Sequence, residues 1–363
     1  MNKLRVIISA GGTGGHIYPA LAIINKIKER EPNSEFLYVG PHDRMEKDII
    51  PKYGINYRPI EMYGFNRKKL LTNFKTIKYL FKSYKKCQKI IKDFKPDVVI
   101  GVGGYITVPV ILAAHKLEVK TFIHEQNSVP GAANTFLSKY VDAIGVSFKT
   151  SVKYFPEYKT TLTGNPCSEE ALKQIAVSKK SLGLTERKKL VLIVMGSLGS
   201  SKINNYLIEN INNFEGKDYE VLLISGNDNY EMFKKLNLPR NVLVVPYLEQ
   251  LPRIMKQTDL IVSRAGASAL SEIISLELPS ILIPSPYVTN NHQYKNALDL
   301  IESDAAILLE EKDLIGNALV KTIDGIIFNE NRLKELKRNM KPFKVVDSSM
   351  RIYQVLKELV GRK

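Results

Sequence analysis

The sequence predicts an α/β protein of two doubly wound domains, each built on a parallel β-sheet with helices on both faces. The first observation is length, because 363 residues exceed what one hydrophobic core usually supports. The second is that short strand candidates rich in Val, Ile and Leu alternate with helical patterns. The third is that this alternation starts again after residue 163. An apolar content of 44% and a charged content of 25% are typical of a soluble globular protein.

The strand candidates divide into two series along the chain. The first series comprises residues 4–9, 35–39, 57–61, 97–102, 121–124, 143–146 and 160–162, and the second comprises 189–194, 219–224, 242–245, 259–262 and 280–284. Between the series lies Gly164-Asn165-Pro166, where an Asn-Pro step after Gly disfavours continued regular structure. We therefore expect domains at 1–163 and 164–342.

Cysteine content and hydropathy argue against a disulfide-bonded secreted protein and against a membrane-spanning protein. Cys87 and Cys167 are the only cysteines and lack metal-ligand spacing, so we expect free thiols in a reducing compartment. Residues 1–9 enter a strand pattern directly, without the long apolar region of a secretory signal. The longest apolar stretch, 98–114, is interrupted by Gly and Pro, and we expect no membrane span.

The stretch 263–272, Ser-Arg-Ala-Gly-Ala-Ser-Ala-Leu-Ser-Glu, follows a strand candidate and opens a helix. Small residues there let backbone N–H groups approach an anion, which the positive end of the helix favours. Glu272 lies about one and a half turns into the helix, where a carboxylate can accept hydrogen bonds from two ribose hydroxyls. The stretch predicts a nucleoside diphosphate site; the alternative is an ordinary turn with a surface Glu.

Further glycine-rich loops follow other strand candidates. Residues 10–16 read Ala-Gly-Gly-Thr-Gly-Gly-His, and the absence of Cβ atoms favours backbone contact with phosphate. Tight packing is the alternative. Ile17 stands where a dinucleotide fingerprint needs its third Gly, so that fingerprint is excluded. Residues 101–105 and 194–201 are similar loops, and Ser197 in the latter is a candidate hydroxyl donor to phosphate.

Four polar residues, His124-Glu125-Gln126-Asn127, follow the apolar strand candidate 121–124. His and Glu are suited to proton transfer, and the amides can bind sugar hydroxyls. The alternative is a polar loop end with ordinary caps. Gln293 and Asn296 are three residues apart on one predicted helix, so we expect both to contact one sugar.

Positive charge concentrates in the N-terminal half. Residues 1–163 hold 26 Lys and Arg against 13 acidic residues, which is +13 of a total net charge of +16. Within this half, 67–95 hold 11 basic residues against Asp93 alone, and apolar residues recur at helical spacing over 70–91. This basic amphipathic helix predicts binding to anionic lipids, each basic residue contributing about 1 kcal/mol. Nucleic acid ranks second, because no recognisable nucleic-acid motif accompanies the charge.

The sequence offers no carboxylate pair for a metal bound to diphosphate, because it contains no Asp-x-Asp. We expect no metal and no cofactor, and helix N-termini would carry the diphosphate charge.

Taken together, these motifs resemble the MurG family in identity and order. They are Gly11-Gly12-Thr13-Gly14-Gly15-His16, Gly103-Gly104-Tyr105, His124 to Asn127, Gly164-Asn165-Pro166, Ser263 to Gly266 with Glu272, and Gln293-Tyr294 with Asn296-Ala297. The resemblance spans essentially the whole chain. It implies a GT-B fold and a peripheral enzyme of peptidoglycan synthesis on the cytoplasmic face of the cell membrane. That family transfers GlcNAc from UDP-GlcNAc to undecaprenyl-diphospho-MurNAc-pentapeptide (lipid I), giving lipid II.

The resemblance also assigns roles to parts of the chain. It implies an acceptor domain at the N-terminus, a donor domain at the C-terminus, and a last helix near 343–363 that returns to the first domain. The implied donor-binding residues, to which our own interpretation adds Asn296, are Thr13, Gly14, Gly15, Asn127, Ser197, Leu248, Ala267, Ser268, Ala269, Leu270, Ser271, Glu272 and Gln293. Read from the residues alone, the Thr13–Gly15 loop would instead hold the acceptor diphosphate. Two departures stand out: Ser168 replaces a family Arg, and Leu198 replaces a family Gln.

The predicted reaction is an inverting transfer in which the MurNAc C4 hydroxyl attacks the anomeric carbon and displaces UDP. His16 is the first candidate for the base and Glu125 the second, while His124 would orient Glu125 or the backbone. One alternative is a UDP-GlcNAc epimerase of similar architecture, which needs no lysine-rich helix. A noncatalytic nucleotide-sugar binder and an NAD-dependent oxidoreductase are weaker alternatives.

Overall fold

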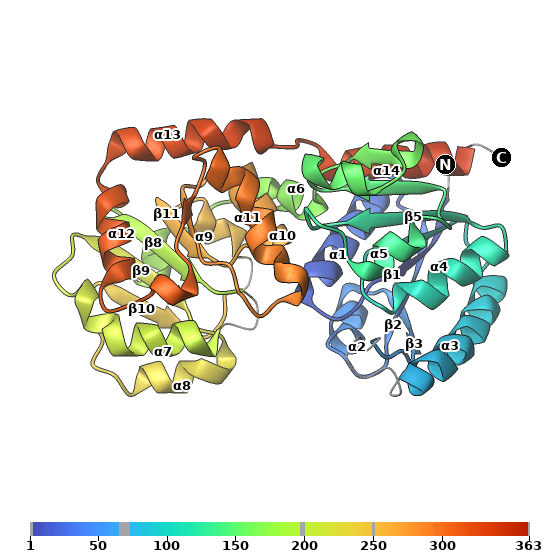
Figure 1. Cartoon of the computed structure of the whole chain (residues 1–363), viewed down its shortest axis with the longest axis horizontal. Coiled ribbons are helices and arrows are strands. Elements are labelled where there is room, and N and C mark those ends of the chain that lie inside the picture. Colours follow the sequence, from blue (N-terminus) through green and yellow to red (C-terminus); the bar gives the residue numbers. More distant parts are fainter. Residues whose placement is uncertain (1–2, 65–72, 197–199, 249–250, 362–363) are drawn as a thin grey trace. The chain divides into compact units, whose positions relative to one another are not determined.

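The computed structural model describes residues 3–64, 73–196, 200–248 and 251–361. The chain forms two compact units. Unit 1 comprises Met1–Cys167 and Asp347–Lys363, and unit 2 comprises Ser168–Val346 (Figure 1). The sequence placed these boundaries a few residues earlier, after 163 and 342.

Unit 1 is built on a seven-stranded parallel sheet with strand order β3-β2-β1-β4-β5-β6-β7. The strands are β1 (Arg5–Ser9), β2 (Glu35–Pro41), β3 (Asn56–Ile60), β4 (Val98–Gly101), β5 (Lys120–Glu125), β6 (Ala143–Val146) and β7 (Thr160–Leu162). The helices are α1 (Gly14–Arg30), α2 (Glu46–Ile49), α3 (Asn73–Phe94), α4 (Thr107–Lys116), α5 (Ala132–Leu137) and α14 (Ser348–Gly361).

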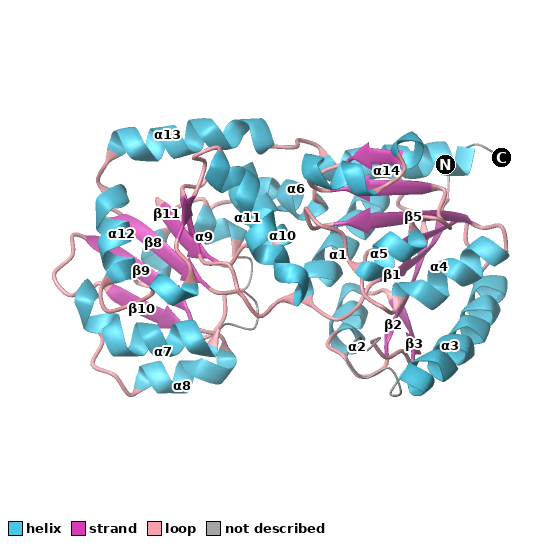
Figure 2. Cartoon of the chain, in the orientation of Figure 1, coloured by secondary structure: helices cyan, strands magenta, loops and turns pink. Residues whose placement is uncertain are grey.

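Alternation along the strands of unit 1 supplies two separate cores. In β1, Val6 and Ile8 pack with α1 and α14, whereas Ile7 packs with α3 and α4 on the other face. Side chains of successive strand residues point to opposite faces, so a strand that is apolar throughout is buried on both. Helices therefore cover both faces of this sheet (Figure 2).

Unit 2 is built on a six-stranded parallel sheet with strand order β10-β9-β8-β11-β12-β13. The strands are β8 (Lys189–Val194), β9 (Tyr219–Ile224), β10 (Val242–Val245), β11 (Leu260–Ser263), β12 (Ser280–Leu282) and β13 (Ile307–Leu308). The helices are α7 (Ser201–Asn210), α8 (Asn227–Lys234), α9 (Pro252–Met255), α10 (Ala267–Ser275), α11 (His292–Glu302), α12 (Ala318–Ile327) and α13 (Glu330–Met340). The remaining helix, α6 (Pro166–Lys173), spans the boundary between the units in the chain.

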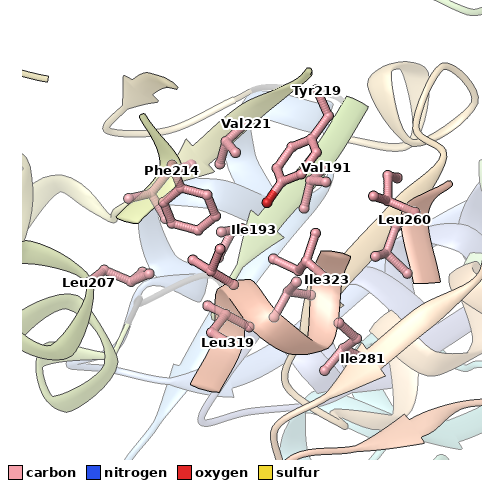
Figure 3. Packing of buried hydrophobic residues seen from close by; sticks show 14 of the residues in the cluster. Val191, Ile193, Leu207, Phe214, Tyr219, Val221, Leu260, Ile281, Leu319 and Ile323 are labelled. Carbon is pink, nitrogen blue, oxygen red and sulfur yellow. The ribbon is translucent and has the colours of Figure 1, made fainter. Parts of the chain in front are cut away.

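The core of unit 2 includes side chains from its central strands and from α12. Val191 and Ile193 of β8 pack with Leu319 and Ile323 of α12 (Figure 3). The aromatic side chains of Phe214 and Tyr219 fill the same cluster, and the Tyr219 hydroxyl donates to Asp324 Oδ1 at 2.9 Å. A buried tyrosine thus has a partner for its polar end.

The C-terminal helix α14 belongs to unit 1 although the chain reaches it only after unit 2. Ile352 and Leu356 are fully buried in the core against α1. At the edge of this contact, Glu31 accepts a hydrogen bond from the Tyr353 hydroxyl at 2.9 Å and lies 2.7 Å from Lys357 Nζ. The core of unit 1 that contains α1 is therefore completed by α14.

The predicted fold class of two doubly wound parallel-sheet domains is confirmed. Five predicted strands, 143–146, 160–162, 189–194, 219–224 and 242–245, have the observed bounds, and the ends of the others differ by at most two residues. The prediction missed β13, because a strand of two residues carries no periodic pattern. In the described part of the chain, no helix combines the length and the apolar character that crossing a bilayer requires.

Candidate functional site

Unit 1 brings the glycine loops together at the point where its strand order reverses. The first strand, β1, pairs with β2 on one side and with β4 on the other. Residues 10–13 follow β1 and residues 102–106 follow β4, so both loops leave the same edge of the sheet. Ligands of open parallel sheets bind at such a reversal.

The two loops of unit 1 interlock closely. Gly11 N donates to Gly103 O at 3.2 Å, and a Cβ on Gly104 would lie 2.3 Å from the Gly11 carbonyl oxygen. A Cβ on Gly103 would lie 2.6 Å from Nδ1 of His16. Tight packing thus explains these glycines.

Other residues of the first loop remain accessible. Thr13 and Gly15 are exposed, and the Thr13 side chain does not cap α1. A Cβ on Gly12 would meet nothing within 4 Å, although its φ of +107° favours glycine. The loop therefore also leaves the N-terminus of a 17-residue helix open to an anion.

Glu46 of α2 supports the first loop, and it is not among the residues predicted from the sequence. Its Oε1 accepts a hydrogen bond from Gly12 N at 2.6 Å, and the residue is fully buried. Nothing in the motif around Glu46 marks it in the sequence, because the contact joins residues 34 positions apart.

His16 is held in the first turn of α1, with its ring among the two glycine loops and the polar run. Its Nδ1 lies 3.1 Å from Oε1 of Gln126. Burial of the ring lowers the pKa of His16 below the ordinary value of 6.5, against weaker opposing effects led by the negative charge of Glu125. The imidazole is therefore neutral at neutral pH and carries one nitrogen lone pair.

Glu125 is enclosed by donors from its own loop. Its carboxylate accepts hydrogen bonds from the backbone of Asn127 (2.9 Å) and Gly131 (3.1 Å), and from the side chains of Asn127 (3.1 Å) and Asn134 (2.8 Å). A carboxylate offers about four lone-pair positions, so these four bonds leave little room for a substrate hydroxyl.

His124 faces the backbone and not Glu125. The ring is fully buried, and its Nε2 lies 3.0 Å from the carbonyl oxygen of Gly164. Burial lowers the pKa of His124 to about 4. A neutral His124 therefore ties the end of β5 to the loop that follows β7.

Unit 2 repeats the arrangement between β8 and β11, where its strand order reverses. The predicted diphosphate stretch follows β11, and Gly266 precedes α10 without a side-chain cap. The loop after β8 contains Ser197, which lies outside the described residues together with Leu198 and Gly199. Ser200 then caps α7 by accepting from Ile203 N.

Arg264 fixes the position of the predicted diphosphate-binding stretch 263–272. Its guanidinium donates to Ile283 O at 2.9 Å, Ser200 Oγ at 2.8 Å and Glu311 Oε1 at 2.5 Å. Lys202 pairs with the other oxygen of Glu311 at 3.2 Å. This network, in which Arg264 and Glu311 are buried and Lys202 is exposed, links the two loops of unit 2. Glu311 and Lys202 are not among the residues predicted from the sequence.

Glu272, which we predict to bind the ribose, lies in the second turn of α10. It is half-buried on α10, and the structure shows no hydrogen bond or ion pair of its carboxylate to any described residue. Burial alone raises the pKa of Glu272 to about 8. An unpaired carboxylate in such a place favours a ligand that donates hydrogen bonds.

The other predicted donor-binding residues of α10 differ in exposure. Ser268 and Ala269 are half-buried, whereas Ala267, Leu270 and Ser271 are buried. The Ser271 hydroxyl donates to the Ala267 carbonyl within the helix at 2.8 Å. The side chains of Ser268 and Ala269 are thus accessible to a ligand. The other residues of the first turn of α10 could contact a ligand only through their backbone N–H groups.

Gln293 and Asn296 both bind loops of unit 2. Gln293 Oε1 accepts from Ser285 N at 2.8 Å, and Asn296 Nδ2 donates to Ala265 O at 3.2 Å. Asn296 is only 1% exposed. Their contact with one sugar stays a prediction, as does donor binding by the half-buried Leu248.

Helix α3 presents an apolar surface to solvent. Phe74 is 73% exposed, Phe81 is 63% exposed, and Ile77 lies between them on the same face. Farther along the helix, Cys87 and Ile91 are buried in the core beneath it. Exposed lysines alternate with the three outward side chains and continue along the helix; they are Lys75, Lys78, Lys82, Lys85, Lys86, Lys89 and Lys92. Arg67, Lys68 and Lys69 lie outside the described residues.

Two family models match the chain in succession. The glycosyltransferase family 28 N-terminal domain matches residues 6–146, and the glycosyltransferase family 28 C-terminal domain matches residues 190–352. The chain belongs to glycosyltransferase family 28.

Relatives named as the same transferase support membership of family 28 over the full length. The UDP-N-acetylglucosamine--N-acetylmuramyl-(pentapeptide) pyrophosphoryl-undecaprenol N-acetylglucosamine transferase of Bacillus subtilis strain 168 is 45% identical over 98% of this chain and 99% of its own. A transferase of the same name from Bacillus cereus is 44% identical over 99% of this chain and all of its own. The resemblance to the MurG family is thereby confirmed.

Solved structures share the fold of this family 28 chain. The crystal structure of Acinetobacter baumannii MurG matches with a TM-score of 0.77 at 22% identity, over 98% of this chain and 99% of that one. A UDP-GlcNAc 2-epimerase from Neisseria meningitidis matches with a TM-score of 0.69 at 13% identity, over 98% and 100%. At these identities the likeness shows the fold alone.

The departure from the family pattern at Ser168 is buried in this family 28 chain. Ser168 is 5% exposed, next to Cys167, whose backbone N–H donates to Asn165 Oδ1 at 3.0 Å. In the described residues no group of three or more His, Cys, Asp or Glu is placed to hold a metal ion.

Proposed function

We propose that this family 28 enzyme transfers GlcNAc from UDP-GlcNAc to the C4 hydroxyl of MurNAc in undecaprenyl-diphospho-MurNAc-pentapeptide. The observation that carries the proposal is full-length identity of 44–45% to transferases of that name. The enzyme is thus an N-acetylglucosaminyltransferase of peptidoglycan synthesis.

Unit 2 binds the donor in this proposal. The uncapped first turn of α10 receives the diphosphate, and the unpaired Glu272 receives the two ribose hydroxyls. The Arg264 network keeps the loop in place, because it ties the stretch to Ser200 and Glu311. The further donor contacts of Thr13, Gly14, Gly15, Asn127, Ser197, Leu248, Gln293 and Asn296 belong to the same proposal.

Unit 1 supplies the base. The acceptor oxygen forms a bond to the anomeric carbon while the bond from that carbon to the UDP oxygen breaks, which inverts the configuration. The hydroxyl proton passes to the lone pair of His16, and UDP leaves with the electron pair and its charge. His16 suits this role because its pKa is lowered, so that the ring is neutral at neutral pH.

Glu125, the second candidate, acts on the loop. Its four hydrogen bonds organise residues 125–134, and its negative charge raises the pKa of His16 against the effect of burial. We therefore assign the proton transfer to His16 and a positioning role to Glu125.

Helix α3 holds the enzyme at the membrane that carries its acceptor. Phe74, Ile77 and Phe81 enter the interface between headgroups and acyl chains, and the neighbouring lysines bind anionic headgroups. The exposed aromatic side chains, which solubility alone would not require, support this assignment. The location that follows is peripheral, on the cytoplasmic face where UDP-GlcNAc is present.

The deciding experiment is UDP release from UDP-GlcNAc with and without a short-chain lipid I analogue, followed by mass analysis of the product. We expect release that depends on the analogue, and a disaccharide product. Interconversion of UDP-GlcNAc without the analogue would establish the epimerase instead, which only the shared fold supports.

A further inference from the structure

We propose that Gln126 is a positioning residue that holds His16 in the tautomer protonated at Nδ1, so that Nε2 carries the lone pair. The catalytic consequence rests on the proposed role of His16 as base. The tautomer itself rests on the arrangement of one buried amide between two histidine rings.

The orientation of the Gln126 amide is fixed by its surroundings. The residue is 2% exposed, and its Nε2 lies 3.1 Å from the carbonyl oxygens of both Val102 and His124. Carbonyl oxygens only accept hydrogen bonds, so the NH₂ group must face them. The reversed amide would bring its own oxygen against both carbonyl oxygens.

The second ring gives the same orientation independently. His124 Nε2 faces the Gly164 carbonyl oxygen at 3.0 Å, so Nε2 carries the proton and Nδ1 is an acceptor. That bare Nδ1 lies 3.0 Å from Nε2 of Gln126 and therefore requires a donor there. Three acceptors thus surround the Gln126 NH₂ group.

The oxygen of Gln126 consequently faces His16. Its Oε1 lies 3.1 Å from His16 Nδ1, and an amide oxygen requires a donor, so Nδ1 carries the hydrogen. The hydrogen bond made by one ring nitrogen sets the state of the other. His16 and His124 are thus held as opposite tautomers by a single side chain.

Packing keeps His16 where the amide can act on it. The ring lies where a Cβ on Gly103 would approach its Nδ1 and Cε1 to 2.6 and 2.7 Å, so the glycine makes room for it. His16 itself stands in the first turn of α1, whose loop is fixed by Glu46 through Gly12. The ring therefore has a defined neighbour on its Nδ1 side.

The test is long-range ¹H–¹⁵N correlation NMR of the full chain labelled with ¹⁵N-histidine, at pH 7.5. We expect a protonated Nδ1 and bare Nε2 for His16, and the reverse for His124. Loss of peaks in His16→Gln and His124→Asn assigns the two rings. A bare Nδ1 on His16 in the unsubstituted protein would overturn the proposal without any variant.

Two substitutions separate positioning from mere packing. Gln126→Leu keeps the approximate volume and removes the amide, and we expect a mixed His16 tautomer and a ten- to hundredfold lower kcat with KM for UDP-GlcNAc unchanged. Gln126→Glu, protonated on the oxygen that faces the Val102 and His124 carbonyl oxygens, keeps an acceptor for His16 Nδ1, so we expect it to retain the tautomer and most of the activity. Gln354→Leu, at an exposed position of α14, is the matched control.

The outcomes distinguish this inference from the proposed function. An unchanged His16 tautomer in Gln126→Leu would overturn the inference even if activity fell. A changed His16 tautomer in Gln126→Leu, together with full activity of both Gln126→Leu and His16→Ala, would support the positioning role of Gln126. It would also show that His16 is not the base.

Discussion

His16 combines a lone pair, a lowered pKa and a fixed ring. We expect His16→Ala to lower kcat by about 10²–10⁴-fold, the usual contribution of general acid–base catalysis, with little change in UDP-GlcNAc affinity. In the unsubstituted enzyme we expect kcat at saturating UDP-GlcNAc to fall only below pH 6.5, because the base is lost when a group of lowered pKa is protonated. Steady-state kinetics over pH 5 to 8 checks both statements, and unaltered turnover of the Ala variant would refute them.

Glu272 is a half-buried carboxyl without a hydrogen bond or ion pair to a described residue, and we propose that it binds the ribose. Its pKa of about 8 means that the free protein holds it mostly protonated at pH 7. Because the ionised form accepts both ribose hydrogen bonds, we expect UDP affinity to rise as the pH rises through 8. Glu272→Gln should weaken binding and abolish this rise.

Calorimetric titration with UDP between pH 6.5 and 9 measures the effect at Glu272. Glu277→Gln, nearby in the chain but paired with Lys344 at 2.9 Å, is the control and should leave the pH dependence unchanged. A pH dependence that persists in Glu272→Gln would assign it to another group.

At the scale of elements, α3 is unusual because it exposes large apolar side chains to solvent. Burying a Phe side chain is worth about 1.5–3 kcal/mol, so two exposed on one face represent a substantial binding potential. We expect Phe74→Ser with Phe81→Ser to reduce binding to anionic vesicles at least tenfold, measured by co-sedimentation. Added salt should weaken the remaining binding, because it screens the lysines.

The control for α3 is Tyr158→Ser, which removes an aromatic side chain that is 86% exposed elsewhere in unit 1. Equal loss of vesicle binding in this variant would indicate a general surface effect. Unchanged binding in the α3 variant would end the membrane assignment.

Elements were predictable from sequence to different degrees. Strands such as β8 and β9 contain uninterrupted apolar runs, 190–194 and 221–224, so the local pattern defines them. The exposure of Phe74 was not predictable, because periodicity gives a helix its stripe but does not say which part of the stripe the sheet reaches. Likewise, the sequence predicts that Gln126 binds a sugar, because it lies in the polar run 124–127. Its contacts with His16 and Val102, both distant in the chain, support the positioning role instead.

For the same reason the candidate site was predicted unevenly. Residues in contiguous loops, such as Thr13 or Glu272, follow from strand–turn–helix chemistry. Glu46 and Glu311 do not, since each acts across the fold on a loop far away in the chain.

At the scale of the molecule, the two units have separate cores, and α14 contributes to one of the two cores of unit 1. We expect Leu356→Ala to cost about 2–5 kcal/mol, as for other buried Leu truncations, and to accelerate hydrogen exchange in α1 and β1. Exchange in β8 and β9 should stay unchanged. Leu336→Ala in α13 is the converse control, because Leu336 is buried in the core of unit 2. Uniform acceleration in both units would contradict separate cores.

The place of α14 also has a consequence for biosynthesis. Domains generally fold as units while the ribosome still extends the chain, the N-terminal one first. Here the first unit to emerge lacks Ile352 and Leu356 until the last helix leaves the exit tunnel, whereas unit 2 has all of its residues before then. Synthesis begins with unit 1 but completes unit 2 first. A nascent chain released early would carry a complete unit 2 and an exposed apolar α1, which is the kind of surface that chaperones and proteases recognise.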